Sequence, residues 1–217
     1  MTMNFASLYS GMFCVVEGLD GTGKTTVVNR IANWLVERGV DVVKTREPGG
    51  TPYCNRIREL LLSLDEGGEG PCQMTELLLF NAARVQHLET LVKPSLQAGK
   101  FVLCDRYVHT TIAYQGEARG LGVGKILELH RLLTQDFWPH FTFILDAPVE
   151  VVLERVYQRG SMNRLDSQTV EFYEKARTAY RRMGQTGRDC ALIDATVSED
   201  EVFNQMTTYL ERLCNKY

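Results

Sequence analysis

A glycine-rich segment near the N-terminus has the residue types and the spacing of a phosphate-binding loop. Residues 18–25 read GLDGTGKT and satisfy the pattern G-x-x-x-x-G-K-[ST], directly after an apolar run and at the start of a helical pattern. Glycines let backbone N–H groups converge on a phosphate, and the start of a helix adds the positive end of its dipole. Lys24 would reach the β- and γ-phosphate oxygens, and the Thr25 hydroxyl would bind Mg²⁺. The segment therefore predicts a site for a nucleoside triphosphate.

Further polar residues directly follow other apolar runs. Asp105 and Arg106 come after residues 101–104, and the segment TREPGGT at residues 45–51 comes after residues 40–43. Proteins with an α/β fold bind their ligands at the C-terminal edge of the sheet, so a carboxylate and a guanidinium are expected at that edge. An internal ion pair between Asp105 and Arg106 is the alternative interpretation.

The elements that must position these residues alternate along the chain. Continuous apolarity within the short runs is typical of parallel strands buried on both faces, and the longer stretches between them have helical spacing. The strands are expected at residues 12–16, 40–43, 101–104, 141–145 and 190–193. The helices are expected at residues 24–38, 55–64, 74–97, 125–134, 149–159, 169–183 and 199–213. This alternation predicts right-handed crossovers and one three-layer α/β domain.

Length, charge and cysteine content limit the class of protein. A chain of 217 residues fits one large domain, and its formal charge of -3 gives no general field for a polyanion, so we expect no nucleic-acid partner. No apolar run approaches the roughly 18 residues of a membrane span, and residues 1–11 have no basic region followed by an apolar core, so we expect no signal peptide. The six cysteines are scattered without a Cys-x-x-Cys pair, which argues against zinc and disulfides. A cytoplasmic protein is expected.

Three classes of protein use such a phosphate loop. A GTP-binding switch should contain Asn-Lys-x-Asp, which is absent, and the Asp-x-x-Gly match at residues 65–68 follows a helical pattern and not a strand. A motor or remodelling ATPase usually has a larger partner-binding domain, for which this chain has no room. The remaining class is a small phosphotransferase.

At this point the sequence strongly resembles the thymidylate kinase family, from residue 12 to about residue 213. The resemblance is carried by the phosphate loop, residues 45–51 and 105–107, Phe80 with Arg84 one helical turn later, and AYQG at residues 113–116. It implies a nucleoside monophosphate kinase fold with a five-stranded parallel sheet, helices on both faces and a mobile lid at about residues 155–168. A single kinase domain would span residues 12–217 after an N-terminal extension of residues 1–11.

The resemblance also implies an activity. A member of this family transfers the γ-phosphoryl group of ATP to dTMP, giving dTDP and ADP for dTTP biosynthesis, with Mg²⁺ as cofactor and as a homodimer. A kinase for another nucleoside monophosphate, or for a deoxynucleoside, is the alternative within the class. A switch that binds a nucleoside triphosphate without catalysis is the alternative from outside it.

Roles for single residues follow from the same resemblance. Phe80 would stack on thymine, Arg84 would donate to the thymine O4 edge, Thr111 would lie near N3, and Tyr114 would crowd the sugar 2' carbon and so favour deoxyribose. For Phe80, a place in the core after three leucines is the alternative. The residues expected to bind dTMP are Asp20, Arg46, Pro48, Phe80, Arg84, Arg106, Thr111, Tyr114 and Gln115.

The ATP side and the metal site are assigned in the same way. Residues 194–196 resemble the adenine-side loop of the family, although a strand-to-helix connection explains them equally well. The residues expected to bind ATP are Gly18, Gly21, Thr22, Gly23, Lys24, Thr25, Thr26, Arg155, Ala195 and Thr196. Those expected at the metal are Thr25, Asp20 and Asp105, and those expected in catalysis are Lys24, Asp20, Arg106, Arg159 and Arg164.

Phosphoryl transfer needs positive charge around the transferred group, and the phosphate loop contains no arginine. The branch of the family typical of bacteria carries its arginines on the lid. This sequence resembles that branch, because it has Arg155 and Arg159 at helical spacing and Arg164 beyond Gly160. Asn163 and Asp166 depart from the acidic residue and the Glu expected around the lid arginine. A solvated charged face is the alternative interpretation.

Overall fold

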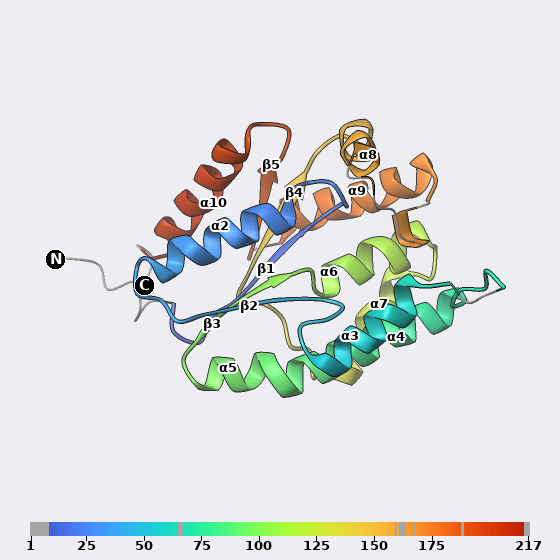
Figure 1. The fold of residues 1–217 in the computed structure, drawn as a ribbon, viewed down its shortest axis with the longest axis horizontal. Coiled ribbons are helices and arrows are strands. Elements are labelled where there is room, and N and C mark those ends of the chain that lie inside the picture. Colours follow the sequence, from blue (N-terminus) through green and yellow to red (C-terminus); the bar gives the residue numbers. More distant parts are fainter. Residues whose placement is uncertain are drawn as a thin grey trace.

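Five parallel strands form one sheet at the centre of the molecule (Figure 1). The computed structural model describes residues 9–64, 67–158, 160, 164–166, 168–187 and 189–214. The strand order is β2-β3-β1-β4-β5. The strands are β1 (Phe13–Gly18), β2 (Val42–Arg46), β3 (Phe101–Asp105), β4 (Phe141–Asp146) and β5 (Cys190–Asp194). All five expected strands are confirmed, with ends shifted by up to three residues.

Helices cover both faces of the sheet, which gives the expected three layers (Figure 1). One face packs on α2 (Lys24–Val36) and α10 (Glu199–Cys214), through side chains such as Ile31 and Met206. The remaining helices are α3 (Pro52–Leu62), α4 (Gln73–His87), α5 (Lys93–Gln97), α6 (Val108–Thr111), α7 (Val123–Thr134), α8 (Val149–Gln158) and α9 (Val170–Thr186). Of these, α3 packs on α4, and the others cover the other face of the sheet, with Leu77, Ile126 and Tyr173 among the buried contacts. No helix among the described residues is long and apolar enough to cross a membrane.

Three short non-α segments complete the described elements. The π-helical turn η1 (Leu88–Val92) joins α4 to α5, so the stretch expected as one helix is continuous but locally widened. A second π-helical segment, η2 (Ile112–Ala118), continues α6, and the sequence analysis missed this α6–η2 helix altogether. The 3₁₀ turn η3 (Arg164–Asp166) lies in the segment expected to form the lid.

The register of the sheet brings the chemistry-bearing strand ends to one edge. Asp105 at the end of β3 pairs with Val16 of β1 and with Arg46 of β2, while Gly18 of β1 pairs with Leu145 of β4. The phosphate loop, Arg46 and Arg106 therefore leave the sheet at the same level. Parts of two expected segments lie outside the described residues: residues 1–8 of the N-terminal extension, and residues 159, 161–163 and 167 of the lid.

Candidate active site

The phosphate loop needs glycine at positions where the chain turns tightly. Gly18 and Gly21 have φ of 136° and 86°, and a Cβ there would lie 2.4 Å from the Leu145 carbonyl oxygen and 2.6 Å from that of Val152. Gly23 adopts the left-handed conformation at the start of α2, and no side chain caps this helix end. The first-turn N–H groups of α2 are therefore left for a ligand, as in an anion site at a helix N-terminus.

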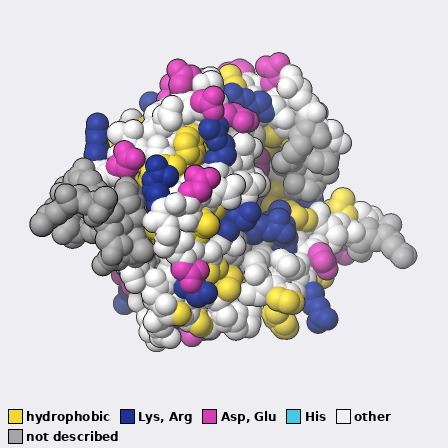
Figure 2. Space-filling model, turned by 60° about the vertical axis from the view of Figure 1, so that its left-hand side comes forward, with side chains coloured by type: hydrophobic (Ala, Val, Ile, Leu, Met, Phe, Trp, Pro, Cys, Tyr) yellow, Lys and Arg dark blue, Asp and Glu magenta, His cyan; other side chains and the backbone are white. Residues whose placement is uncertain are grey.

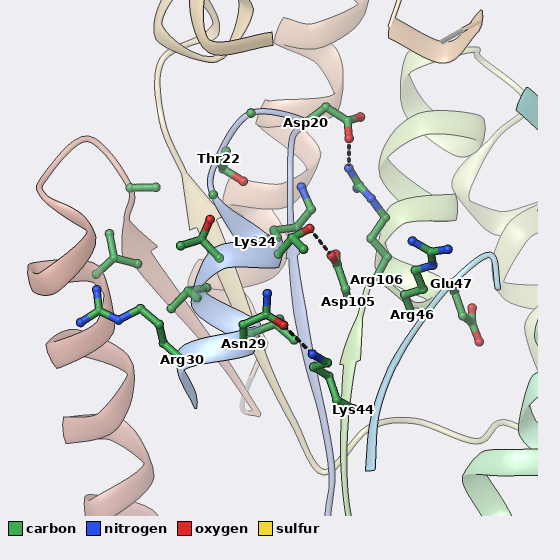
Figure 3. Close-up of a pocket in the computed structure, with 18 of the residues that line it drawn as sticks. Asp20, Thr22, Lys24, Asn29, Arg30, Lys44, Arg46, Glu47, Asp105 and Arg106 are labelled. Atoms are coloured by element: carbon green, nitrogen blue, oxygen red, sulfur yellow. Dashed lines mark hydrogen bonds and ion pairs between the residues drawn. The ribbon is translucent and has the colours of Figure 1, made fainter. Parts of the chain in front are cut away.

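Lys24, at the start of α2, lies beside the turn of the phosphate loop (Figure 3). The side chain is buried, and its Nζ donates to the Leu19 carbonyl oxygen at 2.6 Å. Burial and the Arg106 charge lower the pKa of Lys24 to about 8, against the opposing effect of Asp20 and Asp105. An anion placed in the loop would relieve this cost, because it supplies the missing countercharge.

Thr25 and Asp105 form a small oxygen-rich group beside the loop. The Thr25 hydroxyl donates to Asp105 Oδ2 at 3.0 Å, and Asp105 Oδ1 is buried without a hydrogen-bond partner. A hydroxyl and one carboxylate fit Mg²⁺, which is usually held by one or two carboxylates, water and substrate phosphates. No cluster of three or more His, Cys, Asp or Glu side chains suited to a metal occurs in the described part of the chain.

Asp20 and Arg106 are paired across the loop. Arg106 Nη2 donates to Asp20 Oδ1 at 2.7 Å (Figure 3). The Tyr114 hydroxyl donates to Asp20 Oδ2 at 3.2 Å. Burial would raise the pKa of Asp20, but the Arg106 and Lys24 charges hold it well below its usual range. The carboxylate is therefore ionised at neutral pH. Arg106 itself has a left-handed φ of 73°, which is uncommon for a residue with a side chain.

A cavity of about 860 Å³ opens at this edge of the sheet. Arg46, Arg58 and Arg106 line one part of it together with residues 20–25 of the phosphate loop, and Arg30 of α2 and Arg155 of α8 also line it. Arg58, on α3, was not expected; it donates to the Pro48 carbonyl oxygen, and burial and the charges of Arg46 and Arg106 lower its pKa. Figure 2 shows Lys and Arg side chains gathered in the middle of the face that it displays. The part of the cavity lined by Arg46, Arg58 and Arg106, called the arginine end below, is suited to a second phosphate group.

The opposite end of the cavity lies between α2, α8 and the loop before α10. Arg155, Ala195, Val197, Glu199 and Val202 line it, and Arg155 Nη1 donates to the Ala195 carbonyl oxygen at 3.0 Å. Thr26, in the first turn of α2, lines the cavity as expected. Thr196 does not line it, and its hydroxyl instead donates to Asp194 Oδ1.

A buried polar network lies behind the arginine end of the cavity. Arg84 is 2 % exposed, and it donates from Nε to Glu47 Oε2 at 2.8 Å and from Nη2 to the Thr111 hydroxyl at 2.9 Å. Burial would raise the pKa of Glu47, but Arg84 and the His87 ring hold it below its usual value. Arg84 Nη1 and Gln115 Oε1 are both buried without a hydrogen-bond partner. Unpaired polar atoms of this kind call for an explanation, and a polar ligand supplies one.

The other residues expected around dTMP are buried beside the cavity and do not line it. Phe80 is 6 % exposed and packs with Ile57, Leu61 and Ala83, as its alternative interpretation as a core residue requires. Tyr114 reaches the site through its bond to Asp20. The expected dTMP residues outside the lining are Pro48, Phe80, Arg84, Thr111, Tyr114 and Gln115.

Known proteins share both the sequence and the fold. The family model described as Thymidylate kinase matches residues 16–206. Thymidylate kinase from Pseudomonas entomophila is 46% identical over 86% of this chain and 88% of its own length, and that from Protochlamydia amoebophila is 40% identical over 94% and 93%. The crystal structure of thymidylate kinase from Ehrlichia chaffeensis matches with a TM-score of 0.75 at 32% identity, covering 93% of this chain and 99% of the other.

The chain belongs to the thymidylate kinase family. The matched residues 16–206 include every residue that the sequence analysis assigned to the site. The five-stranded parallel sheet with helices on both faces is therefore the fold that the family resemblance implied, and the enzyme class is the expected one.

The lid arginines of this thymidylate kinase family member lie in different surroundings. Arg155 reaches the cavity, as described above. Arg164 does not: its Nε and Nη2 donate to the Leu61 carbonyl oxygen, and Nη2 also donates to Glu76 Oε2 at 2.7 Å. Arg159 and Asn163 lie outside the described residues. The roles of Arg159 and Arg164 in phosphoryl transfer therefore stay predictions.

Proposed function

We propose that the cavity holds ATP and dTMP end to end, with the phosphate loop between the adenine end and the arginine end. As a member of the thymidylate kinase family, the enzyme transfers the γ-phosphoryl group of ATP to dTMP, giving dTDP and ADP. One observation carries the assignment of residues: a single cavity is lined by the phosphate loop and by three arginines from separate elements. Two phosphate groups that must meet in line need such an arrangement.

ATP would occupy the loop and the end of the cavity beside α10. The triphosphate would accept hydrogen bonds from the first-turn N–H groups of α2, and Lys24 would turn from the Leu19 carbonyl to the phosphate oxygens. The adenine would lie against Arg155, Ala195 and Val197. Thr25 and Asp105 would hold Mg²⁺, which supplies neutralisation of phosphate charge when bound.

dTMP would present its phosphate to Arg46, Arg58 and Arg106, and its base to the buried network around Arg84. The unpaired Nη1 of Arg84 and Oε1 of Gln115 match the acceptor and the donor that a thymine edge offers. Tyr114, fixed by its bond to Asp20, would lie against the sugar and leave little space for a 2'-hydroxyl. Asp20 would face the 3'-hydroxyl.

Catalysis then consists of positioning and charge stabilisation. Negative charge spreads over the oxygens of the transferred group, and Lys24 and Arg106, which both line the cavity, would stabilise it. Both groups are held at the cavity by protein partners before substrate arrives: Lys24 by the Leu19 carbonyl oxygen, which it would leave for the phosphate, and Arg106 by Asp20. Arg159 and Arg164 would add charge from the lid.

A homodimer is part of the proposal. Large apolar side chains are exposed on two helices that pack together, α4 and α7. They are Met74, Leu78, Leu127, Leu132 and Leu133. Exposed leucines are common when scattered singly, but several on neighbouring helices fit a surface that a second copy covers.

A cytoplasmic location is also proposed. Cys14, Cys54, Cys72, Cys104 and Cys190 are all free thiols. Thiols persist in compartments that are kept reducing, so this pattern supports the proposal.

One assay tests the substrate assignment. ADP release from ATP would be measured by a coupled reaction with dTMP, dUMP, dCMP, dGMP, dAMP and thymidine in turn. We expect the highest kcat/KM with dTMP and no ADP release with thymidine, because thymidine brings no phosphate to the three arginines. A higher kcat/KM with another monophosphate, or turnover of thymidine, would contradict the proposal.

A further inference from the structure

A buried carboxylate that the proposed mechanism does not use lies directly before the phosphate loop. Glu17, on β1, is 0 % exposed and does not line the cavity. Its Oε1 accepts the N–H groups of Tyr107 at 2.7 Å and Thr110 at 3.2 Å. Its Oε2 accepts the Thr110 hydroxyl at 2.6 Å and the Tyr180 hydroxyl at 3.1 Å. One side chain thus takes four hydrogen bonds from two helices and the turn before them.

The charge beside Glu17 comes from Arg106. Burial raises the pKa of Glu17, and the Arg106 charge and the hydrogen bonds from Thr110, Tyr107 and Tyr180 oppose this shift. His109 Nδ1 lies 3.9 Å from Glu17 Oε1, but burial lowers the pKa of His109 to about 3, so that ring is neutral. The main electrostatic partner of this carboxylate is therefore Arg106, which lines the cavity, with a smaller interaction with Lys24.

Glu17 reaches Arg106 through two hydroxyl groups. Arg106 Nη1 lies 3.1 Å from Thr110 Oγ1 and 3.3 Å from the Tyr180 hydroxyl oxygen. Each hydroxyl has one hydrogen, and a hydrogen directed to Glu17 leaves a lone pair for Arg106. The Tyr180 hydrogen can also be shared with Thr110, 2.8 Å away, and its oxygen still accepts from Arg106. The carboxylate thus makes both hydroxyls acceptors on the side facing the guanidinium.

The same arrangement fixes how the guanidinium is aimed. Nη1 is held by the two hydroxyls and by the Gly18 carbonyl oxygen at 2.9 Å, while Nη2 points to Asp20 at the cavity. A guanidinium is planar and rigid, so fixing one nitrogen sets the direction of the others. Arg106 also departs from the strand with a left-handed φ, and the Tyr107 N–H that follows is bound by Glu17.

We propose that Glu17 is a positioning residue for the monophosphate: it orients the Thr110 and Tyr180 hydroxyls so that Arg106 is aimed at the dTMP phosphate. This inference rests on the proposed function, because Arg106 can only act on a phosphate that the cavity holds. Glu17 also anchors the first turn of the α6–η2 helix, which carries Thr111, Tyr114 and Gln115. A test must separate the two roles.

Glu17→Gln separates them, because it keeps the size of the side chain. The amide oxygen can still accept the two backbone N–H groups, so the helix keeps its anchor. The amide nitrogen takes the place of Oε2 and must donate, which turns the hydroxyl hydrogens toward Arg106. Binding of dTMP and of thymidine would be measured separately by calorimetry. We expect dTMP affinity to fall about tenfold, in the range of one lost charged hydrogen bond, and thymidine affinity to stay unchanged.

Two companion variants make the result specific. Arg106→Ala reports whether the arginine binds the phosphate, and adding Glu17→Gln to Arg106→Ala should cause no further loss, because the two act in series. Asp146→Asn is the matched control: Asp146 is a half-buried carboxylate at the end of a strand, and its ion pairs are to Arg177 at 2.8 Å and to Arg181. It should leave dTMP binding unchanged.

Each other outcome overturns one part of the account. If Glu17→Gln weakens thymidine as much as dTMP, or adds fully to Arg106→Ala, Glu17 acts only by holding the helix and the inference fails. If Arg106→Ala leaves dTMP binding intact, the assignment of Arg106 in the proposed function fails first. If Glu17→Gln does not fold, Tyr180→Phe removes one of the two acceptors; we expect about a threefold loss for dTMP alone, and no loss would overturn the inference.

Discussion

At the scale of single residues, Lys24 gives the most direct test of the phosphate loop. Its Nζ is buried and already bound to the loop backbone, so it is in place before the triphosphate arrives. Loss of one preorganised stabiliser of developing charge costs about 10² to 10³ in kcat. We therefore expect Lys24→Ala to lower kcat by about 10² or more, measured by steady-state ADP release at saturating substrates.

The control for Lys24→Ala is Lys93→Ala. Lys93 forms a surface ion pair with Glu89 outside the cavity, so its loss should leave kcat unchanged. If the Lys24→Ala enzyme keeps more than half of the wild-type kcat, the assignment of the phosphate loop to catalysis is wrong.

Phe80 belongs both to an apolar cluster and to the expected thymine site, so truncation to alanine would confuse two effects. Phe80→Leu keeps an apolar side chain against Ile57 and Leu61 but removes the ring. Stacking on a base is worth about 1 to 3 kcal/mol, so we expect the KM for dTMP to rise about tenfold while the KM for ATP changes little. Equal changes in both KM values, with a lowered Tm, would assign Phe80 to packing alone.

The sequence predicted those site residues that a motif fixes at consecutive positions. It did not predict Arg58, because only the packing of α3 places that side chain at the cavity. The phosphate loop prescribes Lys24 and Thr25 once its glycines are recognised. On α3, Arg56 and Arg58 are two residues apart and look alike in the sequence; only in the fold is Arg58 half-buried at the cavity while Arg56 is exposed. The same limit applies to Glu17, whose partners come from segments more than 80 residues away.

At the scale of elements, the α6–η2 helix shows why periodicity fails for a fully buried segment. Residues 107–116 are buried throughout, so the segment has no polar face and no helical period in the sequence. Thr110, Thr111 and Ile112 are β-branched and Gly116 follows, all of which lower helix propensity. Tertiary contacts, among them the bonds to Glu17, override this preference. The helix that carries three expected dTMP residues was thus the one that sequence could not predict.

Glu76 on α4 joins two other elements and gives a pH prediction. It accepts hydrogen bonds from Gln115 of η2, from Arg119 after it, and from Arg164 of η3. Burial would raise the pKa of Glu76, but these three partners hold it below 4.5. A carboxylate with a lowered pKa in the folded state stabilises the protein above its unfolded pKa, and this contribution is lost as pH falls through the folded pKa.

Glu76→Gln should therefore lower the free energy of unfolding at pH 7 by about 3 kcal/mol, because it leaves buried arginine charge unpaired. The difference in free energy of unfolding between wild type and variant should become smaller as pH falls below about 4.5, as measured by urea unfolding at a series of pH values. Glu171→Gln, which removes an exposed ion pair with Lys175, should show neither effect. A gap that stays constant with pH would mean that Glu76 contributes by shape and not by charge.

Arg164 tests the lid. In the structure its guanidinium is bound to Glu76 and to the Leu61 carbonyl oxygen, and it must leave them to reach a phosphate. If it does so only in the transition state, Arg164→Ala should lower kcat and kcat/KM alike, by about tenfold or more, with dTMP affinity nearly unchanged. Arg164→Lys should recover little, since lysine lacks the planar fork. If Arg164→Ala turns over dTMP at the wild-type rate but has a lowered Tm, Arg164 stabilises the fold through its bonds with Glu76 and Leu61 and does not act in catalysis.

At the scale of the whole molecule, the sheet was predictable because its strands are short apolar runs, and the three central strands, β1, β3 and β4, are buried along almost their whole length. Once Val15 and Val102 lie in neighbouring parallel strands, the ends of β1, β2 and β3 must converge, and the polar residues after them form one site. No comparable pattern predicts which outer helices remain exposed, because an outward leucine looks the same in the sequence as a buried one. Leu77 and Leu78 are adjacent, yet Leu77 is buried and Leu78 is 53 % exposed.

The proposed homodimer can be tested on this surface. Leu78 of α4 lies on a helix that packs against α7, which itself exposes Leu132, so a second copy placed there would bury both. Leu78→Glu would put a charge in an apolar interface and should shift the protein from dimer to monomer, measured by light scattering at micromolar concentration. Val36→Glu is the matched control, since Val36 is 57 % exposed at the end of α2, on the other face of the sheet, and should leave the mass unchanged. A Leu78→Glu protein that stays dimeric would move the interface elsewhere, and a monomeric wild type would exclude the dimer itself.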